Sequence, residues 1–116
     1  MKKIDVVKNY WISEGEKNLA KILSNFTEDA KFSSPTMNLE GRDDIKIFYE
    51  GMVTGFKAIT VTPTYWIEKG DEIAVEYDAK LIRNSGEEGL AKGFNLFKIK
   101  KGLIKSLRCY YNPADF

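Results

Sequence analysis

The sequence contains no histidine, so acid–base chemistry in this protein must come from Asp, Glu, Lys or Tyr side chains. Adjacent carboxylates such as Asp43 with Asp44, or Glu87 with Glu88, are of the type that binds a metal ion. Adjacent side chains point in different directions, however, and both pairs lie beside turn residues, so solvated charge explains them better. We therefore expect neither a metal site nor a cofactor.

The stretch NFTEDAKFSSPT, residues 25–36, predicts the end of one element followed by a short strand that stops at Pro35. The polar groups at the end of this strand are serines rather than an acid. A serine hydroxyl is too weak to abstract a proton alone, and no histidine is present to activate it. Ser34 is therefore either a pocket group or part of the turn that ends the strand.

Asn95 is an unusual residue for its surroundings, because its neighbours Phe94, Leu96 and Phe97 are all apolar. The centre of a strand disfavours Asn, and a buried amide must find hydrogen-bond partners. We expect Asn95 to line a pocket in which a ligand or another side chain supplies those partners.

Three helices are predicted to position these groups. Apolar residues follow helical spacing from Val6 to Trp11 and again from Leu19 to Phe26, with a break near Gly15. The third helix is GRDDIKIFYEGMVTGF, residues 41–56, where acidic residues in the first turn suit the helix dipole.

From Thr60 the hydrophobic period changes to two, which is typical of strands. Strand-like segments cover residues 60–67, 72–82, 89–100 and 103–111, separated by turn signals. The pattern predicts an α+β fold in which three N-terminal helices pack on a strongly curved antiparallel sheet.

Composition limits the classes of function. The 116 residues, 43% hydrophobic and 30% charged, predict a single domain, residues 1–116, in an ordinary soluble protein. A net charge of +1 gives no electrostatic case for nucleic acid or membrane partners. The single cysteine, Cys109, cannot form an internal disulfide, and the first residues lack an apolar run ahead of a small-residue cleavage site, so we expect a cytoplasmic location.

The order of these elements resembles the nuclear transport factor 2-like superfamily, and within it the SnoaL-like group of polyketide cyclases and ketosteroid isomerase. The residues that carry the resemblance are Phe26 to Ala30, the helix start from Gly41 to Tyr49 and the closing segment from Gly102 to Tyr111. The resemblance covers nearly the whole chain. It implies a cone-shaped fold that encloses one pocket, and a homodimer formed through the sheet.

The resemblance also implies roles for individual residues. In ketosteroid isomerase a tyrosine of the first helix and a protonated aspartic acid donate to the oxyanion, and an aspartate before the strand-ending proline is the general base. The matching positions here are Tyr10, Asn95 and Ser34, so the donors are retained and the base is lost. Tyr111 occupies the position of a pocket-lining aromatic. Tyr10 fits equally well as a core residue whose hydroxyl finds a partner.

Strand parity predicts the pocket walls. If Asn95 points inward, Phe97 and Ile99 share its face, while Phe94, Leu96 and Lys98 point outward. The other expected wall residues are Val75, Tyr77, Ala79 and Leu81 from the preceding strand, and Met52, Val53 and Phe56 from the third helix. Core packing alone also explains this apolar set, since burial of each large side chain contributes roughly 1.5 to 3 kcal/mol.

The sequence is compatible with ligand binding and with catalysis, and the absence of a general base at the Ser34 position favours one of them. Because Asp29 should face water and Asp78 has outward parity, the sequence favours a non-catalytic protein that binds a small hydrophobic or aromatic molecule. The alternative is a SnoaL-like isomerase, cyclase or hydratase that acts on a hydrophobic carbonyl substrate, with Tyr10 and Asn95 polarising its oxygen. A scaffold that binds partners through its sheet fits less well than a homodimer interface there.

Overall fold

The computed structural model describes residues 2–115 of the chain. Its helices are α1 (Lys3–Gly15), α2 (Leu19–Ser24), α3 (Gly41–Gly55) and the short 3-10 helix η1 (Pro113–Asp115). Its strands are β1 (Phe26–Ser33), β2 (Asn38–Glu40), β3 (Phe56–Lys69), β4 (Glu72–Arg83), β5 (Glu88–Lys100) and β6 (Leu103–Tyr111). The predicted α+β class and the three α-helices are confirmed over this range.

The strands form one sheet in the order β2-β1-β6-β5-β4-β3. Most neighbouring strands are antiparallel, but β1 runs parallel to β6, so the sheet is mixed where the sequence predicted an antiparallel one. A parallel pair needs a long crossover, which here consists of β2, α3 and the meander from β3 to β5. The third helix therefore follows the first two strands, and the local turn signals in the sequence do not reveal this long-range pairing.

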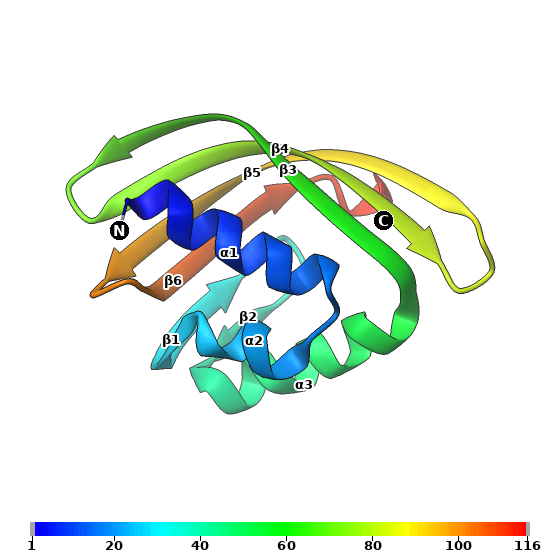
Figure 1. Cartoon of the computed structure of the whole chain (residues 1–116), viewed down its shortest axis with the longest axis horizontal. Coiled ribbons are helices and arrows are strands. Elements are labelled where there is room, and N and C mark those ends of the chain that lie inside the picture. The colour runs from blue at the N-terminus through cyan, green and yellow to red at the C-terminus, as the bar shows by residue number, and fades with distance from the viewer. Residues whose placement is uncertain (1, 116) are drawn as a thin grey trace.

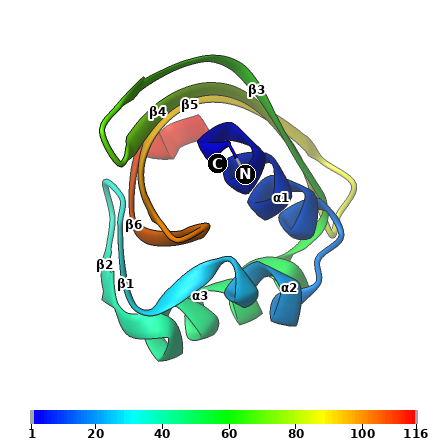
Figure 2. The same ribbon diagram turned by 60° about the vertical axis from the view of Figure 1, so that its left-hand side comes forward.

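The sheet curves strongly around α1, while α2 and α3 lie across its open end (Figures 1 and 2). Within residues 2–115, four register shifts interrupt the strand pairing, and they include one between Pro63 and Tyr65 of β3 and one between Lys98 and Ile99 of β5. Bulges of this kind bend a strand and increase its twist. Together the helices and the bent sheet form the cone expected from the sequence.

The inner face of the sheet and one side of α1 form the core. Strand parity is confirmed, because the residues expected to point inward on β4 and β5 are buried: Val75, Tyr77, Ala79, Leu81, Asn95, Phe97 and Ile99. In α1, the buried side includes Val6, Val7, Tyr10 and Trp11. The break between α1 and α2 falls where predicted, at Gly15, and Lys17 there adopts a positive φ of 54°.

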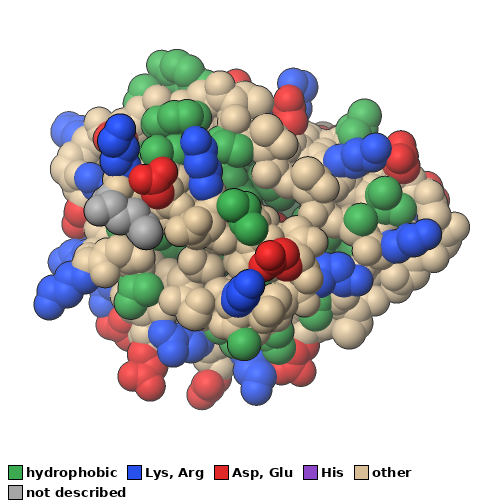
Figure 3. Space-filling view, viewed as in Figure 1, with side chains coloured by type: hydrophobic (Ala, Val, Ile, Leu, Met, Phe, Trp, Pro, Cys, Tyr) green, Lys and Arg blue, Asp and Glu red, His purple; other side chains and the backbone are tan. Residues whose placement is uncertain are grey.

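Some large hydrophobic side chains remain on the outside. Figure 3 shows hydrophobic side chains gathered at the upper left, over the end of the β3–β4 hairpin, where Tyr65, Trp66 and Ile67 are exposed. The ammonium group of Lys8 lies 5.3 Å from the centre of the Trp66 ring, which is cation–π distance. Within residues 2–115, no helix has the length and apolar character needed to cross a membrane.

Candidate functional site

A cavity of about 440 Å³ lies between α1, α3 and the inner face of the sheet. Its wall is mainly apolar and contains most of the residues predicted to bind a ligand: Tyr10, Ser34, Met52, Phe56, Tyr77, Asn95 and Tyr111. Phe97 does not line the cavity, and neither do Val53 and Val75, which were expected in its wall. Phe97 is fully buried behind the wall, and its ring packs edge-on against Tyr10 and Trp11 at centroid distances of 6.0 and 5.8 Å. Phe97 therefore supports residues that line the cavity.

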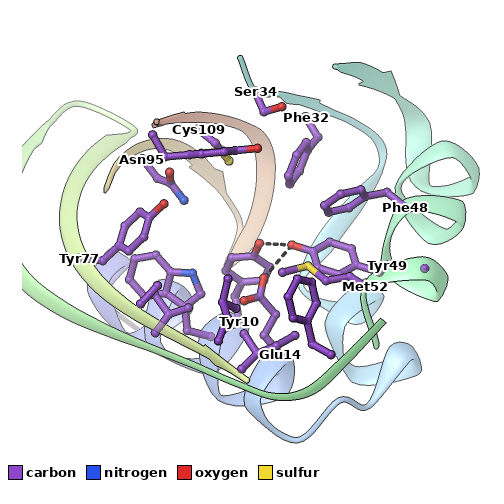
Figure 4. Close-up of a pocket in the computed structure, with 18 of the residues that line it drawn as sticks. Tyr10, Glu14, Phe32, Ser34, Phe48, Tyr49, Met52, Tyr77, Asn95 and Cys109 are labelled. Atoms are coloured by element: carbon purple, nitrogen blue, oxygen red, sulfur yellow. Dashed lines mark hydrogen bonds between the residues drawn. The ribbon is translucent and has the colours of Figure 1, made fainter. Parts of the chain in front are cut away.

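The polar centre of the cavity is a hydrogen-bonded group that we call the Tyr–Glu network: Tyr10, Tyr49 and Glu14. The Tyr49 hydroxyl donates to Glu14 Oε2 at 2.9 Å, and the Tyr10 and Tyr49 hydroxyls are hydrogen-bonded to each other. Figure 4 shows these three side chains meeting between α1 and α3. Each is at most 5% exposed, so the network is largely shielded from bulk water.

Glu14 is the functional candidate that the sequence reasoning missed. It lies one helical turn after Tyr10, so the two side chains share a face of α1. Glu14 directly precedes the break at Gly15, where a solvated charge is expected, but it still belongs to the last turn of α1 and its side chain is buried. The expectation that the pocket lacks an acid is therefore wrong.

Burial determines the protonation of this network. Loss of water around Glu14 raises the pKa of its carboxyl, and the hydrogen bonds from Tyr10 and Tyr49 oppose that rise only in part. Burial, followed by the nearby Glu14 charge, raises the pKa of both tyrosines well above the usual value, so both phenols stay protonated near neutral pH. Glu14 is thus the acid of the network, and its neutral form persists to higher pH than that of a solvated glutamate.

Ser34 lines the cavity but is occupied by its own turn. Its half-buried hydroxyl accepts from the backbone N–H of Thr36 at 3.2 Å and lies 3.3 Å from the Thr36 hydroxyl. These contacts agree with the strand-end interpretation. No general base occupies this position, and the carboxyl of the pocket comes instead from α1.

Asn95 points into the cavity from β5, as its parity predicted, and is only 5% exposed. Its Oδ1 has no hydrogen-bond partner within residues 2–115. The expectation that Tyr10 and Asn95 polarise one substrate oxygen stays a prediction, and in the structure the Tyr10 hydroxyl is hydrogen-bonded to Tyr49. Figure 4 shows Asn95 beside Tyr77 and Cys109, on the sheet side of the cavity away from the Tyr–Glu network.

Cys109 and the remaining acids offer no alternative chemistry. Burial, reinforced by Glu14, raises the pKa of the Cys109 thiol, which disfavours the nucleophilic thiolate. Asp29 and Asp78 are exposed, as predicted, and pair with Lys105 and Lys92. Among the described residues, no three His, Cys, Asp or Glu side chains lie close enough together to hold a metal ion.

Several solved structures share this fold. An NTF2-like protein of unknown function from Burkholderia pseudomallei superposes with a TM-score of 0.84, at 16% identity, over 96% of this chain and 91% of that chain. A protein with a ketosteroid isomerase-like fold from Catenulispora acidiphila, solved with trimethylamine, gives a TM-score of 0.86 at 16% identity, over 95% and 87% of the two chains.

A third structure is that of SalBIII, an epoxide hydrolase/cyclase-like enzyme in pyran ring formation in the polyether salinomycin. It gives a TM-score of 0.84 at 21% identity, over 97% of this chain and 92% of that chain. At such identities the likeness shows the fold alone. No curated protein has a significant match to the sequence. Residues 7–107 match the model of the SnoaL-like domain, and the chain therefore belongs to the SnoaL-like domain family.

Proposed function

We propose that this protein binds a small, mainly apolar molecule in the cavity between α1, α3 and the sheet. The observation that carries the proposal is the cavity itself, about 440 Å³ in volume and lined by aromatic and aliphatic side chains with a few polar groups among them. A volume and lining of this kind are typical of small-molecule sites. The polar groups lie on opposite walls, the Tyr–Glu network against α1 and α3 and Asn95 on β5, so they orient a molecule that spans the cavity.

A blocking variant tests this proposal. Ala79 lies in the cavity wall, and Ala79→Phe places a ring in the space that the ligand would occupy. Ala74→Phe, on the same strand but outside the set of cavity-lining residues, is the matched control. Native mass spectrometry should detect a bound small molecule on the wild type and on Ala74→Phe, and none on Ala79→Phe.

Two results would contradict small-molecule binding. One is a wild-type protein with no bound mass, either as purified or after incubation with the naphthalene probes described below. The other is an equal bound mass on Ala79→Phe, which would place the molecule outside the cavity. Circular dichroism of each variant establishes that it folds.

A second candidate function, acid–base catalysis on the bound molecule, is favoured by Glu14. A buried carboxyl whose pKa is raised holds its proton to higher pH than a solvated one, and is a stronger base once ionised. The two tyrosine hydroxyls connect it with the cavity, and each can give one proton while it takes another, so the phenols end unchanged. Such a relay would protonate or deprotonate an oxygen of the substrate, as isomerisation, cyclisation or hydration requires.

The Glu14→Gln variant separates binding from catalysis. Gln can still accept the hydrogen bond from Tyr49, but it cannot transfer a proton. In a catalytic protein, Glu14→Gln should retain unconverted substrate while the wild type holds product. Because isomerisation and cyclisation leave the mass unchanged, the released molecules are compared by chromatography as well as by mass. Identical bound molecules on both proteins, with no turnover of either in the presence of wild-type protein, would leave binding as the function.

A further inference from the structure

We propose that the molecule bound in this cavity presents a hydrogen-bond donor, an O–H or N–H group, to Oδ1 of Asn95. This inference rests on the proposed small-molecule binding and adds the chemical class of the ligand. A ketone or an ether, which only accepts hydrogen bonds, would not satisfy this wall of the cavity.

The first step is that Oδ1 of Asn95 is an acceptor without a donor. The side chain is 5% exposed, and Oδ1 has no partner within the described residues. A buried polar atom left without a hydrogen bond costs free energy, so such atoms are uncommon in folded proteins. An unpaired acceptor in the wall of an apolar cavity indicates that a molecule bound in the cavity supplies the hydrogen-bond donor.

The second step is that neighbouring protein groups do not supply the donor: even with Tyr77 beside it, Oδ1 of Asn95 has no hydrogen-bond partner among the described residues. Across the sheet, Asn95 pairs with Val75 on one side and Cys109 on the other. A valine side chain has no donor, and a thiol is a weak one. The hydroxyls of Tyr10 and Tyr49 are hydrogen-bonded within the Tyr–Glu network on the other side of the cavity.

The third step concerns the ligand that results. The rest of the cavity wall is mainly apolar, so the donor belongs to a molecule that is otherwise hydrophobic, such as a phenol, an alcohol or a secondary amide. An acceptor-only molecule of the same shape would leave Oδ1 unpaired when it fills the cavity. The site should therefore discriminate between molecules that differ only in this donor.

Two pairs of naphthalenes distinguish the effect on affinity of a hydrogen-bond donor in the ligand from that of an acceptor. 2-Naphthol and 2-methylnaphthalene have the same shape, and only the first carries a donor. 2-Methoxynaphthalene and 2-ethylnaphthalene also share a shape, and the first carries an acceptor without a donor. Isothermal titration calorimetry gives the affinity ratio within each pair for wild type and for Asn95→Leu, so differences in hydration between the probes cancel.

We expect the naphthol to methylnaphthalene ratio to fall about tenfold in Asn95→Leu, the loss of one hydrogen bond. The methoxy to ethyl ratio should change by less than about threefold. Lys92→Ala, an exposed position on the same strand, should keep both wild-type ratios. Asn95→Val, which suits a strand, removes the same amide and replaces Asn95→Leu if that variant does not fold.

Three outcomes would overturn the inference. If both ratios fall together, Asn95 donates to the ligand rather than accepting from it. If neither ratio changes, Asn95 does not contact the ligand, although the molecule still binds in the cavity. If none of the four naphthalenes binds to the wild type, small-molecule binding itself fails, a result distinct from the first two.

Discussion

The carboxyl of Glu14 and the hydroxyl of Tyr49 are joined by a 2.9 Å hydrogen bond across 35 residues of sequence, which connects α1 with α3 at the wall of the cavity. Both side chains are buried, and the Tyr10 hydroxyl extends the contact into a network of three groups. An acid in such a position affects both the stability of the fold and the chemistry that the cavity can perform. The two effects can be measured separately.

The first prediction concerns the pH dependence of stability. Because the pKa of Glu14 is raised in the folded protein, the neutral form contributes stability that is fully present below the unfolded value of about 4.5. That contribution is lost as pH rises towards the folded pKa, at about 1.4 kcal/mol per pH unit within that window. Glu14→Gln does not titrate, so relative to wild type it should gain stability as pH rises above 4.5 towards the folded pKa of Glu14.

Urea unfolding followed by circular dichroism at several pH values between 4 and 8 measures this difference. Glu50→Gln, which changes an exposed carboxyl on α3, is the control and should follow the wild-type profile. Parallel stability profiles for wild type and Glu14→Gln would show that the carboxyl titrates alike in the folded and unfolded chains, contrary to its buried position.

Much of the framework follows from local pattern, but the chemistry of the site does not. The period-two alternation of β4 and β5 predicted that Asn95 and Tyr77 point inward, because parity depends only on the strand itself. The network of Tyr10, Glu14 and Tyr49 depends on how closely α1 approaches α3. That approach is determined by packing between elements far apart in the sequence, and a glutamate near a helix end otherwise indicates a solvated residue.

The second prediction concerns assembly. We propose that two copies pair through the outer face of the sheet, where Phe94 and Tyr110 are opposite each other on β5 and β6 and both are exposed. The same face carries charges of both signs, including the Lys92–Asp78 ion pair, so it can complement a second copy of itself. Leu96→Glu would bury an unpaired charge in this contact and should convert a dimer into a monomer.

Sedimentation velocity at micromolar concentration measures the assembly. Ile47→Glu introduces the same charge at an exposed position of α3, away from the sheet, and should leave the dimer intact. A wild-type monomer under these conditions, or a Leu96→Glu variant that remains dimeric, would contradict pairing through this face.

The third prediction concerns the stability of Asn95→Leu. Oδ1 of Asn95 is a buried acceptor without a partner within the described residues. Replacement of Asn95 by an apolar side chain removes this unsatisfied acceptor and its free-energy cost. We expect a free energy of unfolding within about 1 kcal/mol of wild type, or higher. A loss of more than about 3 kcal/mol in urea unfolding would mean that the amide has a structural partner in solution.

The fourth prediction concerns Gly93, which leaves room for the Tyr77 ring. An added Cβ at Gly93 would collide with the hydroxyl end of Tyr77, whereas at Gly89, on the same strand, its closest contact would be the Asp115 carbonyl oxygen at 3.6 Å. Overpacking of this kind costs typically 1 to 3 kcal/mol, so Gly93→Ala should be less stable than Gly89→Ala by about that amount.

A double-mutant cycle with Tyr77 tests the cause of this loss. Tyr77→Leu shortens the side chain that meets the new methyl group, so adding Gly93→Ala to Tyr77→Leu should lower the free energy of unfolding much less than adding it to the wild type. Strictly additive losses in a urea-unfolding double-mutant cycle would show that Gly93 does not contact Tyr77, and would remove this support for the position of the phenol in the cavity wall.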